Sequence, residues 1–299
     1  MLQYFVQEMW QLVALRLALG LAIGVEYAVG TAVLAEFSRR RGRGVLLGSF
    51  ALAWQAGFSV AFIVGILYDG SDWRMLLASS AIPAGITFLL RLGLPESPMW
   101  LKARGREAEA EAIVRRHFGP GHTIPALTLE QSHPSPAELF RHKNWRAHLY
   151  AGLFWFCQIG PFFAIFTFAM PVFRSLGIDS GVTVDILLNG LQIVGAVFGL
   201  WLLHWLTRRH FVIWTFAIMF AVLLLLGLLP DAPTWLIVTL FAGYMFIAPA
   251  ANNMQFVYPS EIFETRIRST GVGFAAAFSR ISAAAATSVS YTHLRAHET

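Results

Sequence analysis

Four charged residues lie inside long apolar stretches of the sequence: Arg16, Glu26, Asp185 and Arg280. A charge costs several kcal/mol in hydrocarbon, so each of them is expected to face a partner or a water-filled cavity. Glu26 lies ten residues beyond Arg16, roughly 15 Å along a helix, too deep for its carboxyl group to reach water easily. We interpret Glu26 or Asp185 as a proton carrier. Two alternatives stay open: Glu26 as a structural residue bonded to a neighbouring helix, and Arg16 snorkelling to the nearby membrane surface.

Arg280 lies near the middle of its apolar stretch, beside Ser279 and Ser282, with no acidic residue in that stretch. A guanidinium at this depth suits a carboxylate, because its planar fork can bind both oxygens. The pattern therefore favours an anionic substrate. The alternative is an internal ion pair with an acidic residue on a distant helix.

Neutral polar residues supply further candidate substrate contacts. Asp185, Asn189 and Gln192 are spaced i, i+4 and i+7, so they share one face of a helix that is otherwise apolar. Such a stripe is typical of a cavity lining. The candidate substrate-binding set is completed by amide residues on two other apolar stretches: Gln158, Asn252 and Asn253.

The composition excludes most other classes of protein. Of the 299 residues, 57% are hydrophobic and 13% are charged, and the mean hydropathy is +0.60. These values exclude disordered, collagenous and nucleic-acid-binding proteins. The single cysteine, Cys157, excludes an internal disulfide and any multi-cysteine metal site. The sequence also lacks a phosphate-binding Gly-x4-Gly-Lys loop and a His-Glu-x-x-His helix. We therefore expect no enzyme activity, no catalytic residue, no cofactor and no metal.

The elements that must hold these residues are membrane-spanning helices. A span needs about 20 apolar residues, and the blocks that qualify are 11–35, 45–67, 74–93, 148–172, 183–206, 211–229, 234–258 and 269–289. The blocks are continuously apolar rather than alternating, so we predict an all-α multispan bundle and not a barrel. Of the 22 Lys and Arg residues, 17 lie in or close to four alternate connections, which the positive-inside rule makes cytoplasmic. These connections are 36–44, 94–146, 207–210 and 259–268.

An internal repeat relates the two ends of the bundle. Glu36 is followed by Arg43 seven residues later, and Glu261 is followed by Arg268 at the same spacing, with an offset of 225 residues between the copies. Six spans separate the two copies, so the repeat predicts twelve spans, of which three N-terminal spans and the last are outside this sequence. We accordingly expect helices 4–6 of a first six-helix half in 1–93, a cytoplasmic linker with amphipathic helices in 94–146, and helices 7–11 in 147–289. Residues 290–299 have a different composition and are expected to be a non-native tail.

Several motifs resemble the major facilitator superfamily, in particular its sugar-porter and organic-acid symporter branches. They are Arg16-xxx-Gly-xxx-Gly, the Pro-Glu-Ser-Pro-Met-Trp-Leu run that begins at Pro95, and the run from Tyr258 to Gly273. The expected Gly-x3-Asp-Arg-x-Gly-Arg-Arg turn is degraded, with His204 and Thr207 where Asp and Gly belong. The resemblance implies alternating access of two rocking halves and a coupling role for Arg16. It also implies a cytoplasmic gate network of Glu36, Arg43, Glu96, Arg208, Arg209, Glu261 and Arg268.

Our main hypothesis is proton-coupled symport of a small organic acid, with aromatic carboxylates among the candidates. A sugar or polyol symporter is the first alternative, and a membrane receptor that no longer transports is the second. The expected partners are a small-molecule substrate, protons and the lipid bilayer, with no nucleic acid and a monomeric state. The expected location is the cell (plasma or inner) membrane.

Overall fold

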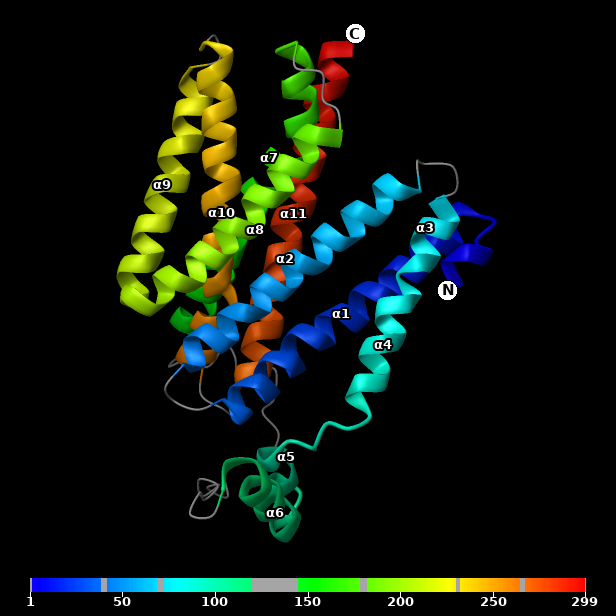
Figure 1. Ribbon diagram of the computed structural model, residues 1–299, viewed down its shortest axis with the longest axis vertical. Helices are drawn as coiled ribbons and strands as arrows, with labels where there is room; N and C mark the ends of the chain where they lie inside the picture. The colour runs from blue at the N-terminus through cyan, green and yellow to red at the C-terminus, as the bar shows by residue number, and fades with distance from the viewer. Residues whose placement is uncertain are drawn as a thin grey trace.

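The computed structural model describes residues 2–38, 42–68, 73–119, 145–177, 182–229, 232–263 and 267–298, and all regular elements in these ranges are helices. Figure 1 shows them as a bundle with a small helical unit beyond its lower end. The elements are the 3-10 helix η1 (Leu2–Phe5) and the α-helices α1 (Met9–Phe37), α2 (Arg43–Leu67), α3 (Trp73–Ser79), α4 (Ala81–Arg91), α5 (Pro98–Ala103), α6 (Glu107–Phe118), α7 (Trp145–Ser175), α8 (Val182–Trp205), α9 (Arg208–Leu228), α10 (Thr234–Ile262) and α11 (Arg268–Glu298).

The predicted all-α multispan fold is confirmed. Within the described residues, seven helical segments are long and apolar enough to cross a membrane, among them α1, α2 and α7 to α10. The seventh is the stretch Trp73–Arg91. The eighth expected block, 269–289, lies in α11, which packs along α7. Large apolar side chains such as Leu17, Leu90 and Phe220 are exposed on outer helix faces, as expected of surfaces that meet lipid.

The expected single helix over 74–93 is broken at Ser80 into α3 and α4. The hydroxyl groups of Ser79 and Ser80 each donate a hydrogen bond of 2.7 Å to a carbonyl of the preceding turn, at Leu76 and Leu77. Pro83 has no N–H group to continue the helical hydrogen bonds across this point. The break therefore follows from two serines and a proline inside an apolar block.

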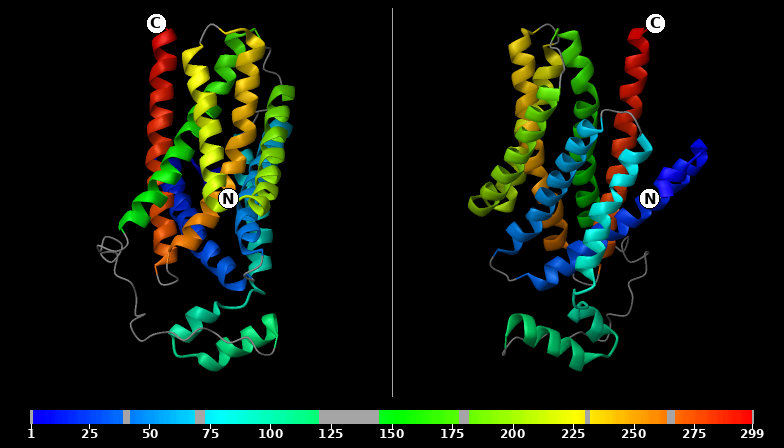
Figure 2. Two further views of the ribbon diagram at one scale, coloured as in Figure 1. Left: turned by 90° about the vertical axis from the view of Figure 1, so that its left-hand side faces the viewer. Right: turned by 45° about the vertical axis from the view of Figure 1, so that its right-hand side comes forward.

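The helices form two groups that meet toward the lower end of the bundle in Figure 1. Helices α1 to α4 make one group and α7 to α11 the other, and they touch where α1 meets α11 and where α2 meets α8 and α10. Figure 2 shows the two groups from the side. Buried residues from both groups form one apolar core, which includes Leu47 of α2, Trp155 of α7, Leu203 of α8 and Met254 of α10.

Helices α5 and α6 lie beyond the lower ends of the spans (Figure 2). Ser97 caps α5 by accepting a hydrogen bond from the backbone N–H of Trp100 at 3.1 Å. Arg106 donates hydrogen bonds of 2.8 and 2.6 Å to the Glu109 carboxylate, which lowers the pKa of that carboxyl group. Residues 120–144 of the expected linker lie outside the described residues.

Helices α8 and α10 approach each other closely because two glycines of α8 face the α10 backbone. A Cβ atom on Gly195 would lie 2.0 Å from the carbonyl oxygen of Phe246, and one on Gly199 would lie 2.6 Å from the Cα atom of Ala250. Small residues at such positions let helix backbones pack directly in a membrane. This contact fixes α8 against α10, which carries part of the site described below.

We expect Gly195→Ala to lower the free energy of unfolding by about 1–3 kcal/mol, because the new methyl group must push the two helices apart. Gly190→Ala on the same helix is the matched control, since a Cβ there meets nothing within 4 Å. That control should leave stability unchanged or raise it by up to about 1 kcal/mol. Thermal unfolding of the purified protein in detergent measures both. Equal midpoints for the two variants would contradict the close packing of α8 on α10.

Candidate functional site

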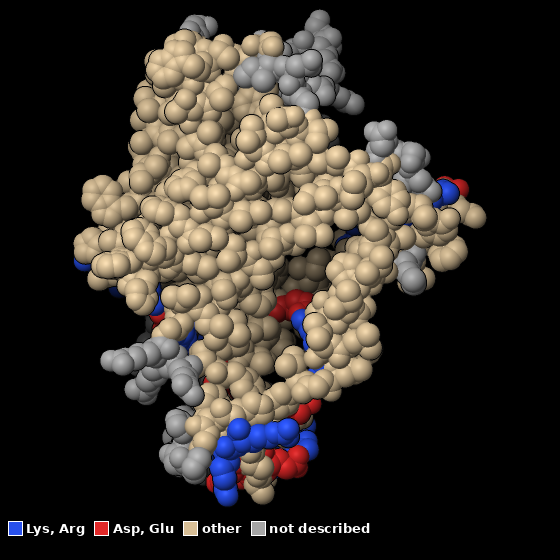
Figure 3. Space-filling view, viewed as in Figure 1, with Lys and Arg blue, Asp and Glu red and all other residues tan. Residues whose placement is uncertain are grey.

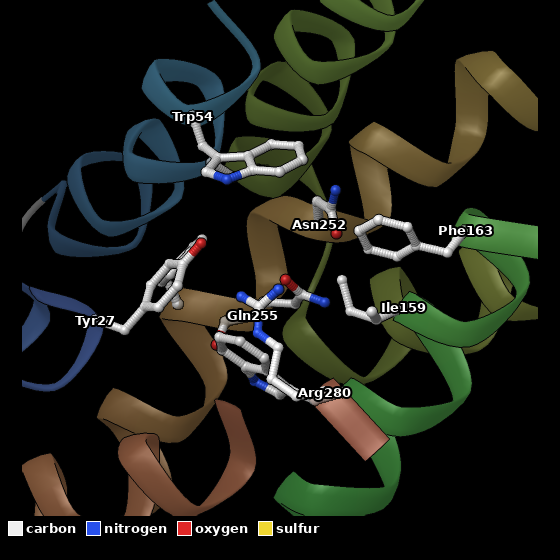
Figure 4. A pocket seen from close by; sticks show the side chains of 10 residues that line it. Tyr27, Trp54, Ile159, Phe163, Asn252, Gln255 and Arg280 are labelled. Carbon is white, nitrogen blue, oxygen red and sulfur yellow. The ribbon is translucent and has the colours of Figure 1, made fainter. Parts of the chain in front are cut away.

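A pocket lies where five helices from both helix groups come together. Figure 4 shows its side chains converging from α1, α2, α7, α10 and α11. A pocket between two helix groups, inside the membrane-spanning region, is a frequent form of ligand site in helix bundles. Its lining residues are Tyr27, Ala51, Trp54, Trp155, Ile159, Phe163, Asn252, Gln255, Phe256 and Arg280.

Arg280 supplies the positive charge of the pocket. It projects from α11 among the other lining side chains (Figure 4). Its guanidinium carbon lies 5.8 Å from the centre of the Tyr27 ring. Among the residues that the structure describes, no carboxylate forms an ion pair with Arg280. The guanidinium is therefore free to bind a carboxylate of a ligand.

Amide side chains in and next to the pocket have unused hydrogen-bonding capacity: Gln255 lines the pocket, and Gln158 is bonded to the lining residue Asn252. Gln158 donates from Nε2 to the carbonyl oxygen of Ala248 at 3.2 Å and to Oδ1 of Asn252, while its own Oε1 is buried without a partner in the described chain. Gln255 is 4% exposed, and its Nε2 is likewise buried without a partner there. Since burying unpaired polar atoms costs free energy, a polar ligand group that pairs with them would be favoured.

The walls and floor of the pocket are aromatic. Trp54, Trp155 and Phe163 line it. Tyr27 lies 5.8 Å from Phe256 in a stacked arrangement and 6.2 Å from Trp155 edge to face, as measured between ring centres. Such rings can hold a flat apolar or aromatic part of a ligand.

The remaining predicted substrate residues lie around this pocket without lining it. Asn253 donates to the carbonyl oxygen of Ala196 at 2.8 Å, which ties α10 to α8. Asn189 donates to the carbonyl oxygen of Asp185 within α8. Gln192 accepts from Nε2 of Gln55 at 3.4 Å, and this hydrogen bond joins the two helix groups.

The structure gives Glu26 a partner that the sequence did not indicate. Arg91, at the end of α4, makes a bidentate ion pair with Glu26 of α1, in which Nη2 lies 2.6 Å from Oε2. Figure 3 shows acidic and basic side chains together in the hollow beside α4. Arg16 is exposed on α1 and forms no ion pair with any described residue. Glu26 therefore faces α4, whereas the adjacent Tyr27 lines the pocket.

The predicted gate residues form two local groups near the cytoplasmic ends of the spans. In the first, Glu36 accepts a hydrogen bond from the Ser97 hydroxyl group and lies close enough to Arg268 to interact with it electrostatically, and Arg268 in turn lies near Arg43. In this group α1 and α2 of one helix group meet α11 of the other.

The second gate group is centred on Arg208 of α9. Its Nε lies 3.3 Å from Oε1 of Glu261, and its guanidinium lies against Gly44 of α2, where a Cβ would be 2.1 Å from Nη2. Glu96 interacts instead with Arg106. Arg209 is exposed and, within the described ranges, forms no ion pair.

Sequence reasoning did not single out Trp54 and Tyr27 as lining residues or Arg91 as the partner of Glu26. Arg91 could have been found from its place at the end of an apolar block. The aromatic residues carried no distinguishing signal, because aromatic side chains also occur on lipid-facing surfaces of the same helices.

Comparison with known proteins identifies the family. A family model described as "Sugar (and other) transporter" matches residues 1–295. The inner membrane metabolite transport protein YgcS of Escherichia coli (strain K12) is 40% identical over 289 residues, covering 96% of this chain and 65% of YgcS. Plastidic glucose transporter 4 of Arabidopsis thaliana is 26% identical, covering 89% of this chain and 52% of that protein. This chain therefore spans less than two thirds of the length of these relatives.

A solved structure has the same fold. The proton:xylose symporter XylE of the major facilitator superfamily, bound to 6-bromo-6-deoxy-D-glucose, superposes with a TM-score of 0.63. Its sequence is 20% identical, and the match covers 86% of this chain and 58% of that one. With its apolar helices and its similarity to YgcS, the chain is a multi-pass protein of the cell (inner) membrane. The matching family consists of transporters and not of enzymes. The chain belongs to the sugar (and other) transporter family, and it has the fold of the major facilitator superfamily symporter XylE.

Proposed function

We propose that the protein is a secondary transporter that carries a small organic carboxylate by alternating access. The observation that carries this proposal is Arg280, a guanidinium in the pocket that no described carboxylate neutralises. A charge that costs several kcal/mol in the membrane is explained when a substrate supplies the opposite charge. Family membership supports transport as the activity, and the pocket supports the class of substrate.

The rest of the pocket fits a carboxylate that carries a flat ring. Trp54, Trp155 and Phe163 offer ring faces and edges, and the Gln255 amide offers an N–H donor beside the guanidinium. A guanidinium and an amide donor can together satisfy both oxygens of one carboxylate. Benzoate is therefore a suitable probe, because it has one carboxylate, one ring and nothing else.

Proton coupling is the second part of the proposal. Glu26 is the proposed proton carrier, and its carboxylate is held by Arg91 in this conformation. Protonation of Glu26 would neutralise one partner of that pair and release α1 from α4. Because Tyr27, the next residue, lines the pocket, movement of α1 would change the pocket in which the substrate binds. Asp185, on α8, is the alternative carrier.

Benzoate uptake into proteoliposomes that contain the protein tests this function. An inward pH gradient should raise the uptake of labelled benzoate well above that of protein-free vesicles. Because benzoic acid also crosses lipid unaided, the vesicles without protein and vesicles with the Arg280→Gln variant are both required. Uptake equal in all three preparations would contradict carboxylate transport. Uptake that requires the protein but is the same with and without the gradient would contradict proton coupling.

A sugar or polyol is the second candidate substrate class. It is favoured by the unpartnered Oε1 of Gln158 and Nε2 of Gln255, because paired acceptors and donors suit hydroxyl groups. Plastidic glucose transporter 4 and the proton:xylose symporter XylE are similar to this chain. Inhibition of benzoate uptake by D-glucose or D-xylose would favour this class, whereas inhibition by other carboxylates alone would favour the first.

A further inference from the structure

Tyr27 is the residue of α1 that lines the pocket, and it contacts the other helix group there. Its ring meets residues of three helices of the other group: Trp155 of α7, Phe256 of α10 and Arg280 of α11. Figure 4 shows the Tyr27 ring facing the pocket opposite Arg280. One side chain of the first group thus contacts the aromatic floor and the charged group together.

The contact with Tyr27 fixes the guanidinium group of Arg280. The guanidinium carbon lies 5.8 Å from the ring centre, within the range of a cation–π interaction. No hydrogen bond or ion pair joins Arg280 to another described residue in this conformation. A long side chain such as that of Arg280 can adopt several rotamers, and the contact with the Tyr27 ring favours the rotamer that places the guanidinium in the pocket.

The ring is itself held in place by packing. It lies nearly parallel to Phe256, at 22° between the ring planes, and perpendicular to Trp155, at 86°. The Nε1 of Trp155 donates to the carbonyl oxygen of Gln255 at 3.2 Å. The aromatic cluster is therefore anchored to the α10 backbone beside Gln255, the residue that offers its amide to the same pocket.

We infer that Tyr27 is a positioning residue, whose ring holds the Arg280 guanidinium in the pocket for an anionic substrate; this inference rests on the carboxylate specificity proposed above. Because the two side chains belong to different helix groups, their contact is lost when the groups move apart. A carboxylate that binds the oriented guanidinium therefore favours the conformation in which α1 and α11 are together. Substrate charge and closure of the cytoplasmic side are linked through one aromatic ring.

The first test needs no ligand. Thermal midpoints of the purified protein are compared for the parent, Tyr27→Leu, Arg280→Gln and the double variant. If the ring and the guanidinium interact, Tyr27→Leu should lower the midpoint by about 2 °C more in the parent than in the Arg280→Gln background. Tyr27→Phe, which keeps the ring face, should retain the coupling. An equal effect of Tyr27→Leu in both backgrounds would overturn the inference.

The second test measures benzoate affinity by isothermal titration. Tyr27→Leu should weaken binding about tenfold, and Tyr27→Phe should weaken it less than about threefold. Phe50→Leu is the matched control, because Phe50 contacts Phe256 at 5.0 Å in the same cluster and is not among the residues that line the pocket. It should bind benzoate as the parent does. Equal losses in the Tyr27→Leu and Phe50→Leu variants would reduce Tyr27 to a packing role and overturn the inference.

The two tests separate failure of this inference from failure of the proposed function. Benzoate affinity that is equal in the parent and in Arg280→Gln contradicts the carboxylate proposal. Loss of the ligand-free coupling between Tyr27 and Arg280 contradicts the positioning role. The outcome of each test does not depend on the outcome of the other.

Discussion

Replacement of Arg280 by Gln is expected to reduce protein-dependent benzoate uptake, at concentrations well below saturation, about 100-fold. A hydrogen bond to a charged group contributes about 1.5–3 kcal/mol, and about 1.4 kcal/mol corresponds to a factor of ten in affinity. The fork of the guanidinium can make two such bonds to one carboxylate. Initial rates of labelled benzoate uptake into proteoliposomes, corrected for protein-free vesicles, give the size of the loss.

Arg280→Lys separates charge from geometry at the same position. The ammonium group keeps the charge but lacks the planar fork, so we expect an intermediate loss, of about tenfold. The thermal midpoints of both variants show that the fold is retained. Uptake by Arg280→Gln within twofold of the parent would contradict Arg280 as the carboxylate-binding group. Unchanged transport of D-xylose by that variant, together with lost benzoate transport, would show that its effect is specific for the anion.

The membrane-spanning elements could be predicted from the sequence because the bilayer imposes a length and a composition on each of them. All the expected blocks contain helices in the structure, and the broken helix at Ser80 is the one clear difference. That break depends on local hydrogen bonds of Ser79 and Ser80 and on Pro83, which an average over an apolar window does not register. Hydropathy therefore predicts where the spans lie, whereas local hydrogen bonding and proline determine where a span is broken.

The pocket was only partly predictable. Polar residues stand out against apolar helices, so Arg280, Gln158 and Asn252 could be selected from the sequence. In the structure Arg280 and Asn252 line the pocket, and Gln158 is bonded to Asn252. Trp54 and Tyr27 were not selected, because an apolar or aromatic residue in a membrane helix faces either lipid or protein, and composition does not distinguish the two. Which faces of α1, α7 and α11 meet is fixed by tertiary packing.

Arg91 illustrates a different limit. A basic residue at the cytoplasmic end of a span is usually explained by the positive-inside rule. With that explanation at hand, nothing in the sequence was a reason to look for an ion-pair partner of Arg91. The structure places Arg91 against Glu26, 65 residues away in sequence. A carboxylate within one span and a guanidinium at the end of another are paired only because tertiary packing brings α4 next to α1.

The Glu26–Arg91 pair leads to the second large expected effect. Glu26→Gln should abolish accumulation of benzoate driven by a pH gradient, because an amide cannot take up and release a proton, while exchange of benzoate across the membrane continues.

In vesicles with the membrane potential held at zero, a gradient of one pH unit should let the parent accumulate substrate up to about tenfold for one proton per substrate, since that gradient stores about 1.4 kcal/mol. The Glu26→Gln variant should reach a ratio near one above the protein-free background. Because this substitution leaves Arg91 without its partner, the double variant Glu26→Gln/Arg91→Gln is the matched control: it removes both charges and should likewise exchange benzoate without accumulating it. Accumulation by either variant at the level of the parent would exclude Glu26 as the carrier, and Asp185→Asn would then be the variant expected to lose it.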